Sequence, residues 1–139
     1  MRSKAGSPGV PLTFHPTPGT IVICDFSTGF RPPEMVKARP VVVISPRRRT
    51  AQLATVVPLP SAAPLPIEPW HYCLPAGAYP PARGPIWVKG DIVTTVALHR
   101  LDRVRTKSRD GGRTYLTFQL GEAELAAVLA CVRRALGLG

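Results

Sequence analysis

Several common sequence features are missing from this chain. Its 139 residues contain no run of 18 apolar residues and no apolar stretch near the N-terminus, so we expect neither a membrane span nor a signal peptide. The three cysteines, Cys24, Cys73 and Cys131, are widely spaced and form no C-x-x-C pair, which argues against a disulfide framework and against a zinc site. This cysteine usage fits a cytoplasmic protein.

The short motifs of several enzyme classes are also missing. The sequence has no G-x-x-x-x-G-K-[ST] phosphate loop, no G-x-S-x-G nucleophile turn and no H-E-x-x-H pair. The eight acidic residues are too scattered to hold Mg²⁺. We therefore expect any chemistry to proceed without a metal ion and without another cofactor.

Positive charge and proline, in contrast, are abundant. Lys and Arg number 18 against eight acidic residues, which gives a net charge of +10, and 14 of the 18 are arginines. Because a guanidinium is well shaped for bidentate contacts with phosphate, we expect a nucleic acid or an acidic protein as a partner. The length and the 45% hydrophobic content fit one folded domain, and the 17 prolines suggest short strands joined by rigid turns.

Runs of β-branched and aromatic residues predict short strands. We place them at 20–26, 40–45, 53–59 and 70–74, on both sides of Gly90 within 86–98, and at 113–120. Residues 60–69 contain four prolines and are expected to form a loop. The Asp-Gly turn in SRDGG (108–112) predicts that 101–107 pairs with 113–120 as a hairpin.

One helix is predicted, at 122–136. Apolar residues recur there at helical spacing, Glu122 and Glu124 fall in the first turn, two arginines fall in the last, and Gly137 follows as a stop. Residues 1–18 lack periodicity and are predicted to form a flexible arm, with the domain over 19–139. The predicted fold class is mostly β: a small, partly open barrel with a C-terminal helix.

Arg39 is the first candidate for a functional residue. It stands directly before Pro40 and the apolar run 41–44, so a rigid strand would carry its guanidinium, and a guanidinium held in this way can stabilise the negative charge of a pentavalent phosphorane. It can equally be a structural arginine that donates to loop carbonyls. Glu34 and Lys37, in the loop leading to Arg39, are either ligand contacts or the solvated charges of a loop.

A second candidate group is the run Arg47, Arg48 and Arg49, just after the same strand. Such a run is either a solvated strand end or a phosphate clamp. In the second case, binding would depend strongly on salt.

A third group surrounds His71. Its imidazole is suited to proton transfer, and Trp70 and Tyr72 on either side offer faces on which a base can stack, although both aromatics fit a core as well. Lys89 and Asp91 flank Gly90, where a bulge or bend would redirect their side chains toward a site.

The sequence also resembles a known family. The segments PGTIVICDF (18–26), KARPVVVIS (37–45), TVVPLPS (55–61) and WVKGDIVTTVALHRLDRV (87–104) occur in an order and spacing similar to those of the PemK/MazF-like toxins of type II toxin–antitoxin modules. The resemblance covers roughly residues 18–136.

This resemblance implies an SH3-like, partly open β-barrel of the MazF/CcdB toxin type with a C-terminal helix, assembled as a homodimer. It also implies a metal-independent, sequence-specific endoribonuclease that cuts single-stranded mRNA by attack of the ribose 2′-OH on the adjacent phosphate. The implied partner is a cognate antitoxin whose acidic, largely disordered tail blocks the site. The net charge of +10 suits both RNA and such a tail.

The resemblance also assigns residues. The arginine of the family's Arg-Pro step is catalytic and corresponds to Arg39. The family's second catalytic residue is a Thr or Ser at the end of the third strand, where this sequence has Pro60 followed by Ser61. We expect Ser61 to take over this role, with its hydroxyl holding a non-bridging phosphate oxygen. Glu34, Lys37, Lys89, His71 and the run 47–49 are expected to contact RNA, and His71 is also the expected proton-transfer residue.

Two other functions remain open. A toxin of the same barrel type can be non-catalytic and inhibit a protein target such as DNA gyrase. Pro60, at the position where the family has a Thr or Ser, is consistent with this alternative. A plain RNA-binding module without activity is the third reading.

Overall fold

The computed structural model describes residues 12–47 and 52–138. The elements in chain order are β1 (Thr20–Asp25), β2 (Ala38–Val43), β3 (Leu53–Pro58), β4 (His71–Cys73), β5 (Trp87–Lys89), β6 (Thr94–Ala97), a 3-10 turn η1 (Leu98–Arg100), β7 (Leu101–Asp102), β8 (Val104–Lys107), β9 (Arg113–Leu116), β10 (Phe118–Gln119) and α1 (Glu122–Ala135). The expected mostly β architecture with one C-terminal helix is confirmed. None of the described helices is long and apolar enough to cross a membrane.

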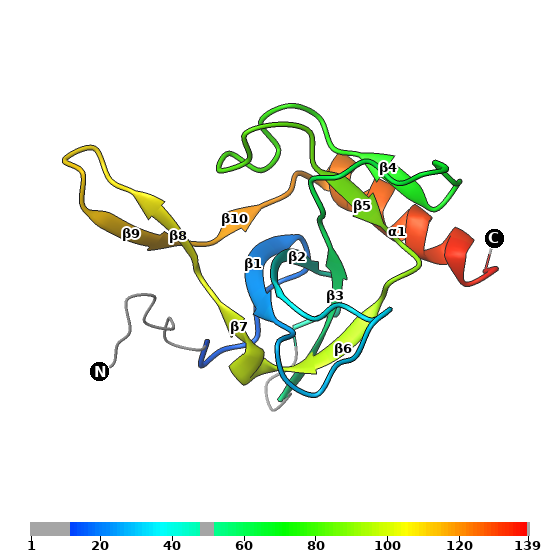
Figure 1. Cartoon of the computed structure of the whole chain (residues 1–139), viewed down its shortest axis with the longest axis horizontal. Helices are drawn as coiled ribbons and strands as arrows, with labels where there is room; N and C mark the ends of the chain where they lie inside the picture. The colour runs from blue at the N-terminus through cyan, green and yellow to red at the C-terminus, as the bar shows by residue number, and fades with distance from the viewer. Residues whose placement is uncertain (1–11, 48–51, 139) are drawn as a thin grey trace.

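A strongly curved antiparallel sheet forms the centre of the molecule (Figure 1). Its strands follow the order β10-β1-β2-β3-β6, and β7 pairs with β1 beyond this path. Two small two-stranded sheets, β4-β5 and β8-β9, complete the fold. The strand predicted at 113–120 is thus divided, because its first half pairs with β8 and its second half pairs with β1.

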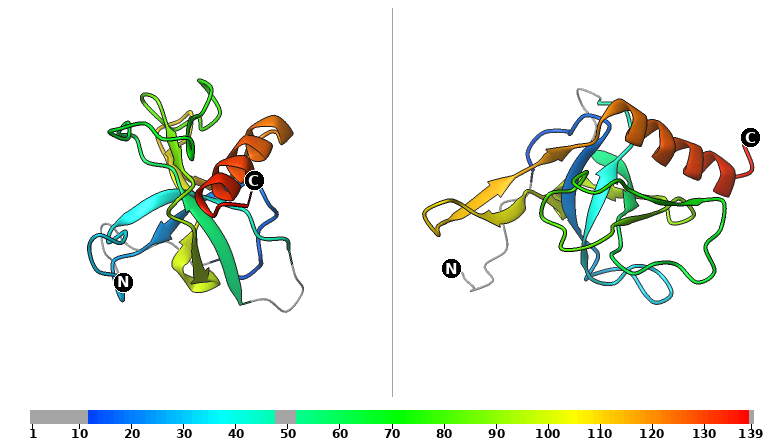
Figure 2. Two further views of the ribbon diagram at one scale, coloured as in Figure 1. Left: turned by 90° about the vertical axis from the view of Figure 1, so that its right-hand side faces the viewer. Right: turned by 90° about the horizontal axis from the view of Figure 1, so that it is seen from above.

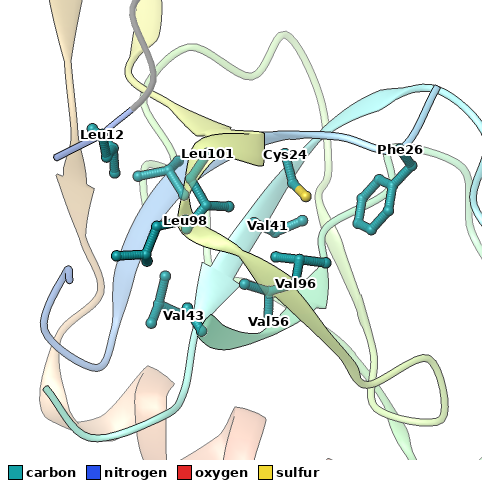
Figure 3. Packing of buried hydrophobic residues seen from close by; sticks show 11 residues of the cluster. Leu12, Cys24, Phe26, Val41, Val43, Val56, Val96, Leu98 and Leu101 are labelled. Carbon is teal, nitrogen blue, oxygen red and sulfur yellow. The ribbon is translucent and has the colours of Figure 1, made fainter. Parts of the chain in front are cut away.

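The sheet is buried on both faces, which explains the continuous apolar run in β2. On the concave face, Val41 and Val43 pack with side chains from β1, β3 and β6, and Figure 3 shows these side chains converging between the strands. On the other face, Val42 packs beneath helix α1. Val41, Val42 and Val43 are all fully buried, and each such side chain contributes about 1.5–3 kcal/mol of hydrophobic stabilisation.

Helix α1 covers the second face together with β4 and β5 (Figures 1 and 2). Val128, Cys131 and Val132 form its buried stripe. Its first turn is acidic, its last turn is basic, and Gly137 after its end has φ +71°, a left-handed conformation that glycine adopts without strain. The prediction of the helix from sequence is confirmed.

The start of β2 was predicted wrongly. The strand begins at Ala38 rather than at Pro40, and it ends at Val43 rather than at Ser45. Ala38 and Arg39 belong to it because they pair with Asp25 and Cys24 of β1. Arg39 is therefore part of a strand and does not lie in the loop before it.

Residues 12–18, part of the predicted N-terminal arm, lie against the barrel. The Leu12 side chain is in the core, and its backbone N–H donates to the Leu101 carbonyl over 2.9 Å. His15 is buried, its Nδ1 donates to the Pro16 carbonyl over 2.7 Å, and its Nε2 lies 3.3 Å from the Ser45 hydroxyl. These bonds give His15 a structural role in fixing this segment.

Candidate functional site

The first half of β2 meets the end of β3 at one end of the sheet. Val41 is opposite Pro58, and the Leu59 backbone N–H donates to the Pro40 carbonyl over 2.9 Å. Continuing this antiparallel register places Pro60 opposite Arg39, on the same face of the sheet. The two segments that the sequence analysis singled out for catalysis are therefore neighbours.

The Arg39 side chain is half-buried and has no protein partner among the described residues. No carbonyl or carboxylate of residues 12–47 and 52–138 accepts a hydrogen bond from its guanidinium. A structural arginine that donates to loop carbonyls would show such bonds, so the described contacts give Arg39 no such structural role. The backbone of Arg39, in contrast, is fixed by the pairing of β2 with β1.

Arg100 is the structural arginine of this region. Its Nη1 donates to the Asp25 carbonyl over 2.9 Å, and its guanidinium lies 4.8 Å from the centre of the Phe30 ring. These contacts join η1 to the β1–β2 loop. Reasoning from the sequence did not single out Arg100, because its hydrogen-bond acceptor lies 75 residues earlier in the chain and no local pattern marks the contact.

Ser61 is exposed at the end of the β3 segment. The carbonyl of Pro60 accepts a hydrogen bond of 2.8 Å from the Trp87 backbone N–H, which ties the segment to the start of β5. In the described part of the chain, the Ser61 hydroxyl makes no hydrogen bond. A rigid backbone thus carries a hydroxyl that is free to donate to a ligand.

The β1–β2 loop borders the same end of the sheet. Glu34 closes a turn in this loop, because its Oε1 accepts from the Arg31 N–H and its own N–H donates to the Arg31 carbonyl, both over 2.7 Å. Glu34 and Asp91 also line a cavity of about 310 Å³, whose other walls are Phe26, Phe30, Met35, Ile92, Val93 and Thr94. Lys37 follows this turn and is exposed.

His71 lies on β4 directly opposite Lys89 on β5. Its Nδ1 accepts a hydrogen bond of 2.9 Å from the Glu68 N–H, so the proton of a neutral ring resides on Nε2. Only 6% of the His71 side chain is exposed, and Nε2 has no hydrogen-bond partner; it lies 3.8 Å from the Asp91 carboxylate. The imidazole is thus held in one tautomer and directed toward a partly exposed carboxylate.

The basic run after β2 is separated from Arg39. Arg47 is exposed and follows the C-terminal end of β2, whereas Arg39 is near its N-terminal end. Arg48 and Arg49 lie outside the described residues. Arg47 therefore lies apart from the place where the start of β2, the end of β3 and the start of β5 of the same chain meet.

The buried cysteines are poor nucleophiles. Burial raises the pKa of the Cys24 thiol from 9.0 to about 12, with a smaller opposing effect from the Arg100 charge, and burial also raises the pKa of Cys131. Cys73 is exposed. In the part of the chain that the structure describes, no three His, Cys, Asp or Glu side chains are grouped as metal ligands would be.

Comparison with known proteins identifies the fold and the family of this chain. A model of the "PemK-like, MazF-like toxin of type II toxin-antitoxin system" matches residues 17–136. An endoribonuclease from a mycobacterial species, solved with its cognate antitoxin, is 21% identical with a TM-score of 0.63, covering 90% of this chain and 98% of its own. MazF from Deinococcus radiodurans is 23% identical with a TM-score of 0.63, covering 88% and 96%. A search among curated proteins gave no match. The predicted MazF-like fold is confirmed.

Proposed function

This chain belongs to the PemK-like, MazF-like toxins of type II toxin–antitoxin systems, and from that premise we propose that it is a metal-independent endoribonuclease that cuts single-stranded RNA at short sequences. In the proposed reaction, the ribose 2′-oxygen attacks the adjacent phosphorus and the bond from phosphorus to the 5′-oxygen breaks. The products are a cyclic phosphate and a 5′-hydroxyl. Solved relatives described as endoribonucleases support this reading.

The observation that carries the proposal is the unpaired guanidinium of Arg39. It is half-buried, its backbone is fixed in a sheet, and no described protein group neutralises it. A guanidinium in this setting can donate two parallel hydrogen bonds to the phosphate oxygens, whose negative charge increases in the transition state. Little reorganisation would be needed at the moment of reaction.

We assign Ser61 the second contact with the phosphate. Extending the β2–β3 register puts Pro60 opposite Arg39, but Pro60 has no side-chain donor, and the next hydroxyl along the chain is that of Ser61. The bond from Trp87 to the Pro60 carbonyl fixes this segment. The Ser61 hydroxyl would donate to a non-bridging oxygen and would not act as the nucleophile.

We assign proton transfer to His71 acting together with Asp91. Its Nε2–H is directed toward Asp91, and this proton has no other acceptor among the described residues. Because Nε2 is buried, His71 would act through the partly exposed Asp91: its Nε2–H would orient the Asp91 carboxylate, which would take the proton of the attacking 2′-hydroxyl and pass it to the leaving 5′-oxygen. Glu34, Lys37 and Lys89 would contact RNA around this centre. Arg47 follows the other end of β2, and the run 47–49 would bind a more distant part of the RNA strand or RNA bound to a second protomer.

The proposed assembly is a cytoplasmic homodimer regulated by an antitoxin with an acidic tail. Relatives have been solved together with an antitoxin, which supports this part of the proposal. The net charge of +10 favours both RNA and an acidic tail as ligands.

Cleavage of a long single-stranded RNA in the presence of EDTA tests the proposal. We expect discrete cuts, located by primer extension, and we expect Arg39→Ala to reduce the cleavage rate by about 10²–10³-fold, the usual effect of losing one oxyanion donor. Arg133→Ala is the matched control, because Arg133 is an exposed arginine on α1 and not on β2. Equal rates for Arg39→Ala and the wild type would remove Arg39 from its role.

Absence of cleavage by the wild type over a range of salt would contradict the nuclease proposal. Inhibition of a protein target would then be the better candidate, and the exposed leucines Leu129, on α1, and Leu136, directly after it, would be the first surface to examine. A DNA gyrase supercoiling assay separates that function from simple RNA binding.

A further inference from the structure

The β8–β9 hairpin extends away from the rest of the molecule. Figures 1 and 2 show it on the side opposite the C-terminal end of α1. Val104, at the base of the hairpin, lies outside the central sheet and is buried. Most residues farther along the hairpin are exposed. The core therefore requires only the base of this hairpin.

One face of the hairpin combines three cations with one aromatic ring. Arg105 is directly opposite Tyr115, and Lys107 is directly opposite Arg113. Because alternate residues of a strand share a face, these four side chains lie together on one surface. All four are exposed, and 43% of Tyr115 is accessible.

The charges on this face are not balanced by the protein. Within residues 12–47 and 52–138, none of the three cations forms an ion pair. Lys107 and Arg113 form a cross-strand pair of like charge, an arrangement that destabilises a hairpin. A bound anion would remove this repulsion.

The only carboxylate of the hairpin serves its turn. Asp110 accepts hydrogen bonds from the Ser108 hydroxyl and, over 3.1 Å, from the Gly112 N–H, and these bonds lower the pKa of its carboxyl. Gly111 adopts φ +89° in the same turn. The turn is thus self-contained and leaves the cations of the two strands free for a ligand.

We propose that this face, formed by Arg105, Lys107, Arg113 and Tyr115, binds single-stranded RNA away from the cleavage site. The cations would contact phosphates, and the Tyr115 ring would stack on a base, the combination found in proteins that bind single strands. An acidic peptide would need the cations but gives no role to the exposed ring. The inference rests on the proposed function, because it treats the hairpin as an arm that holds the RNA substrate.

Binding of a non-cleavable RNA tests this inference. The probe is a fluorescent single-stranded RNA of roughly 20 nucleotides with 2′-O-methyl riboses, longer than one single-strand site. The triple variant Arg105→Ser, Lys107→Ser, Arg113→Ser is compared with Arg83→Ser, Arg133→Ser, Arg134→Ser, which removes the same charge from exposed positions elsewhere. Thermal unfolding of each variant shows that it is folded.

We expect the hairpin variant to bind about tenfold or more weakly, and we expect the slope of log K against log salt to fall by about 2, since each phosphate contact contributes about 0.7 for a single strand. Tyr115→Ser is expected to weaken binding about 5-fold or more, whereas Tyr115→Phe retains the ring and binds like the wild type. The control triple variant should keep a larger share of the affinity and of the slope.

Equal affinity and slope for the two triple variants would overturn the inference. The inference would also be overturned if the hairpin variant lost binding only to a fluorescent poly-glutamate peptide and not to RNA. That result would make the face a site for an acidic protein. Hairpin-dependent RNA binding by a protein that fails to cleave RNA would support this inference while refuting the proposed function. Cleavage of RNA by a protein whose RNA binding does not depend on the hairpin would support the proposed function and refute this inference.

Discussion

Replacing Gly90 with alanine tests how closely β5 and α1 are held together beside the candidate site. Gly90 directly follows β5 and separates Lys89 from Asp91. A Cβ at this position would lie 2.6 Å from the Cys131 carbonyl carbon and 2.8 Å from both its Cβ and its carbonyl oxygen. Non-bonded carbon atoms prefer about 3.5–4.0 Å, so the strand end and the helix would have to separate by roughly 1 Å.

Contacts of both Gly90 and helix α1 oppose this separation. The Gly90 N–H donates to the Trp70 carbonyl over 2.9 Å, and Cys131 belongs to the buried stripe of α1. Overpacking a core in this way costs about 1–3 kcal/mol. For a chain of this length, 1 kcal/mol corresponds to roughly 4 °C in melting temperature, so we expect Gly90→Ala to melt about 4–12 °C below the wild type.

Thermal unfolding followed by circular dichroism measures the effect, with Gly84→Ala as the matched control. A Cβ at Gly84 meets no atom within 4 Å, and Gly84 lies outside the left-handed region. We expect its melting temperature to equal or slightly exceed that of the wild type. Equal melting temperatures for the two alanine variants would refute the close approach of β5 and α1.

Three further predictions follow from the contacts described above. Arg100→Ala should lower the free energy of unfolding in urea by about 1 kcal/mol, because it removes a hydrogen bond to Asp25 and the contact with Phe30; an unchanged midpoint would contradict this role. In native protein, iodoacetamide should modify Cys73 and leave Cys24 unmodified, as mass spectrometry can establish, since only Cys73 is exposed. Because the folded chain retains the Cys24 proton up to a pKa of about 12, whereas the unfolded chain releases it near 9.0, this group should reduce stability above pH 9 by about 1.4 kcal/mol per pH unit; a Cys24→Ala protein with the same alkaline slope would contradict this.

Local patterns in the sequence were sufficient for much of the fold. The spacing of apolar residues predicted the helix at 122–136, and the SRDGG turn predicted the β8–β9 hairpin, because both signals arise within a few neighbouring residues. The start of β2 was missed because Arg39 enters the strand through pairing with Cys24, which is 15 residues away along the chain.

The candidate site shows the same division. The Arg-Pro step and the segment PLPSAAP (58–64) already marked Arg39 and Ser61 in the sequence, and the resemblance to a family supplied roles for both. That the two segments adjoin at one end of the sheet depends on the β2–β3 register, which sequence alone does not fix. The roles themselves stay predictions until cleavage is measured.

The sequence by itself determined the charge, the short strands, the helix and the residue types available for phosphate chemistry, because these follow from composition and local periodicity. Only the tertiary structure decided which charges remain free. Arg100 is held by the Asp25 carbonyl and the Phe30 ring, whereas Arg39 and the hairpin cations have no partner among the described residues. Such a difference arises from contacts between distant segments, and it exists only once the chain has folded.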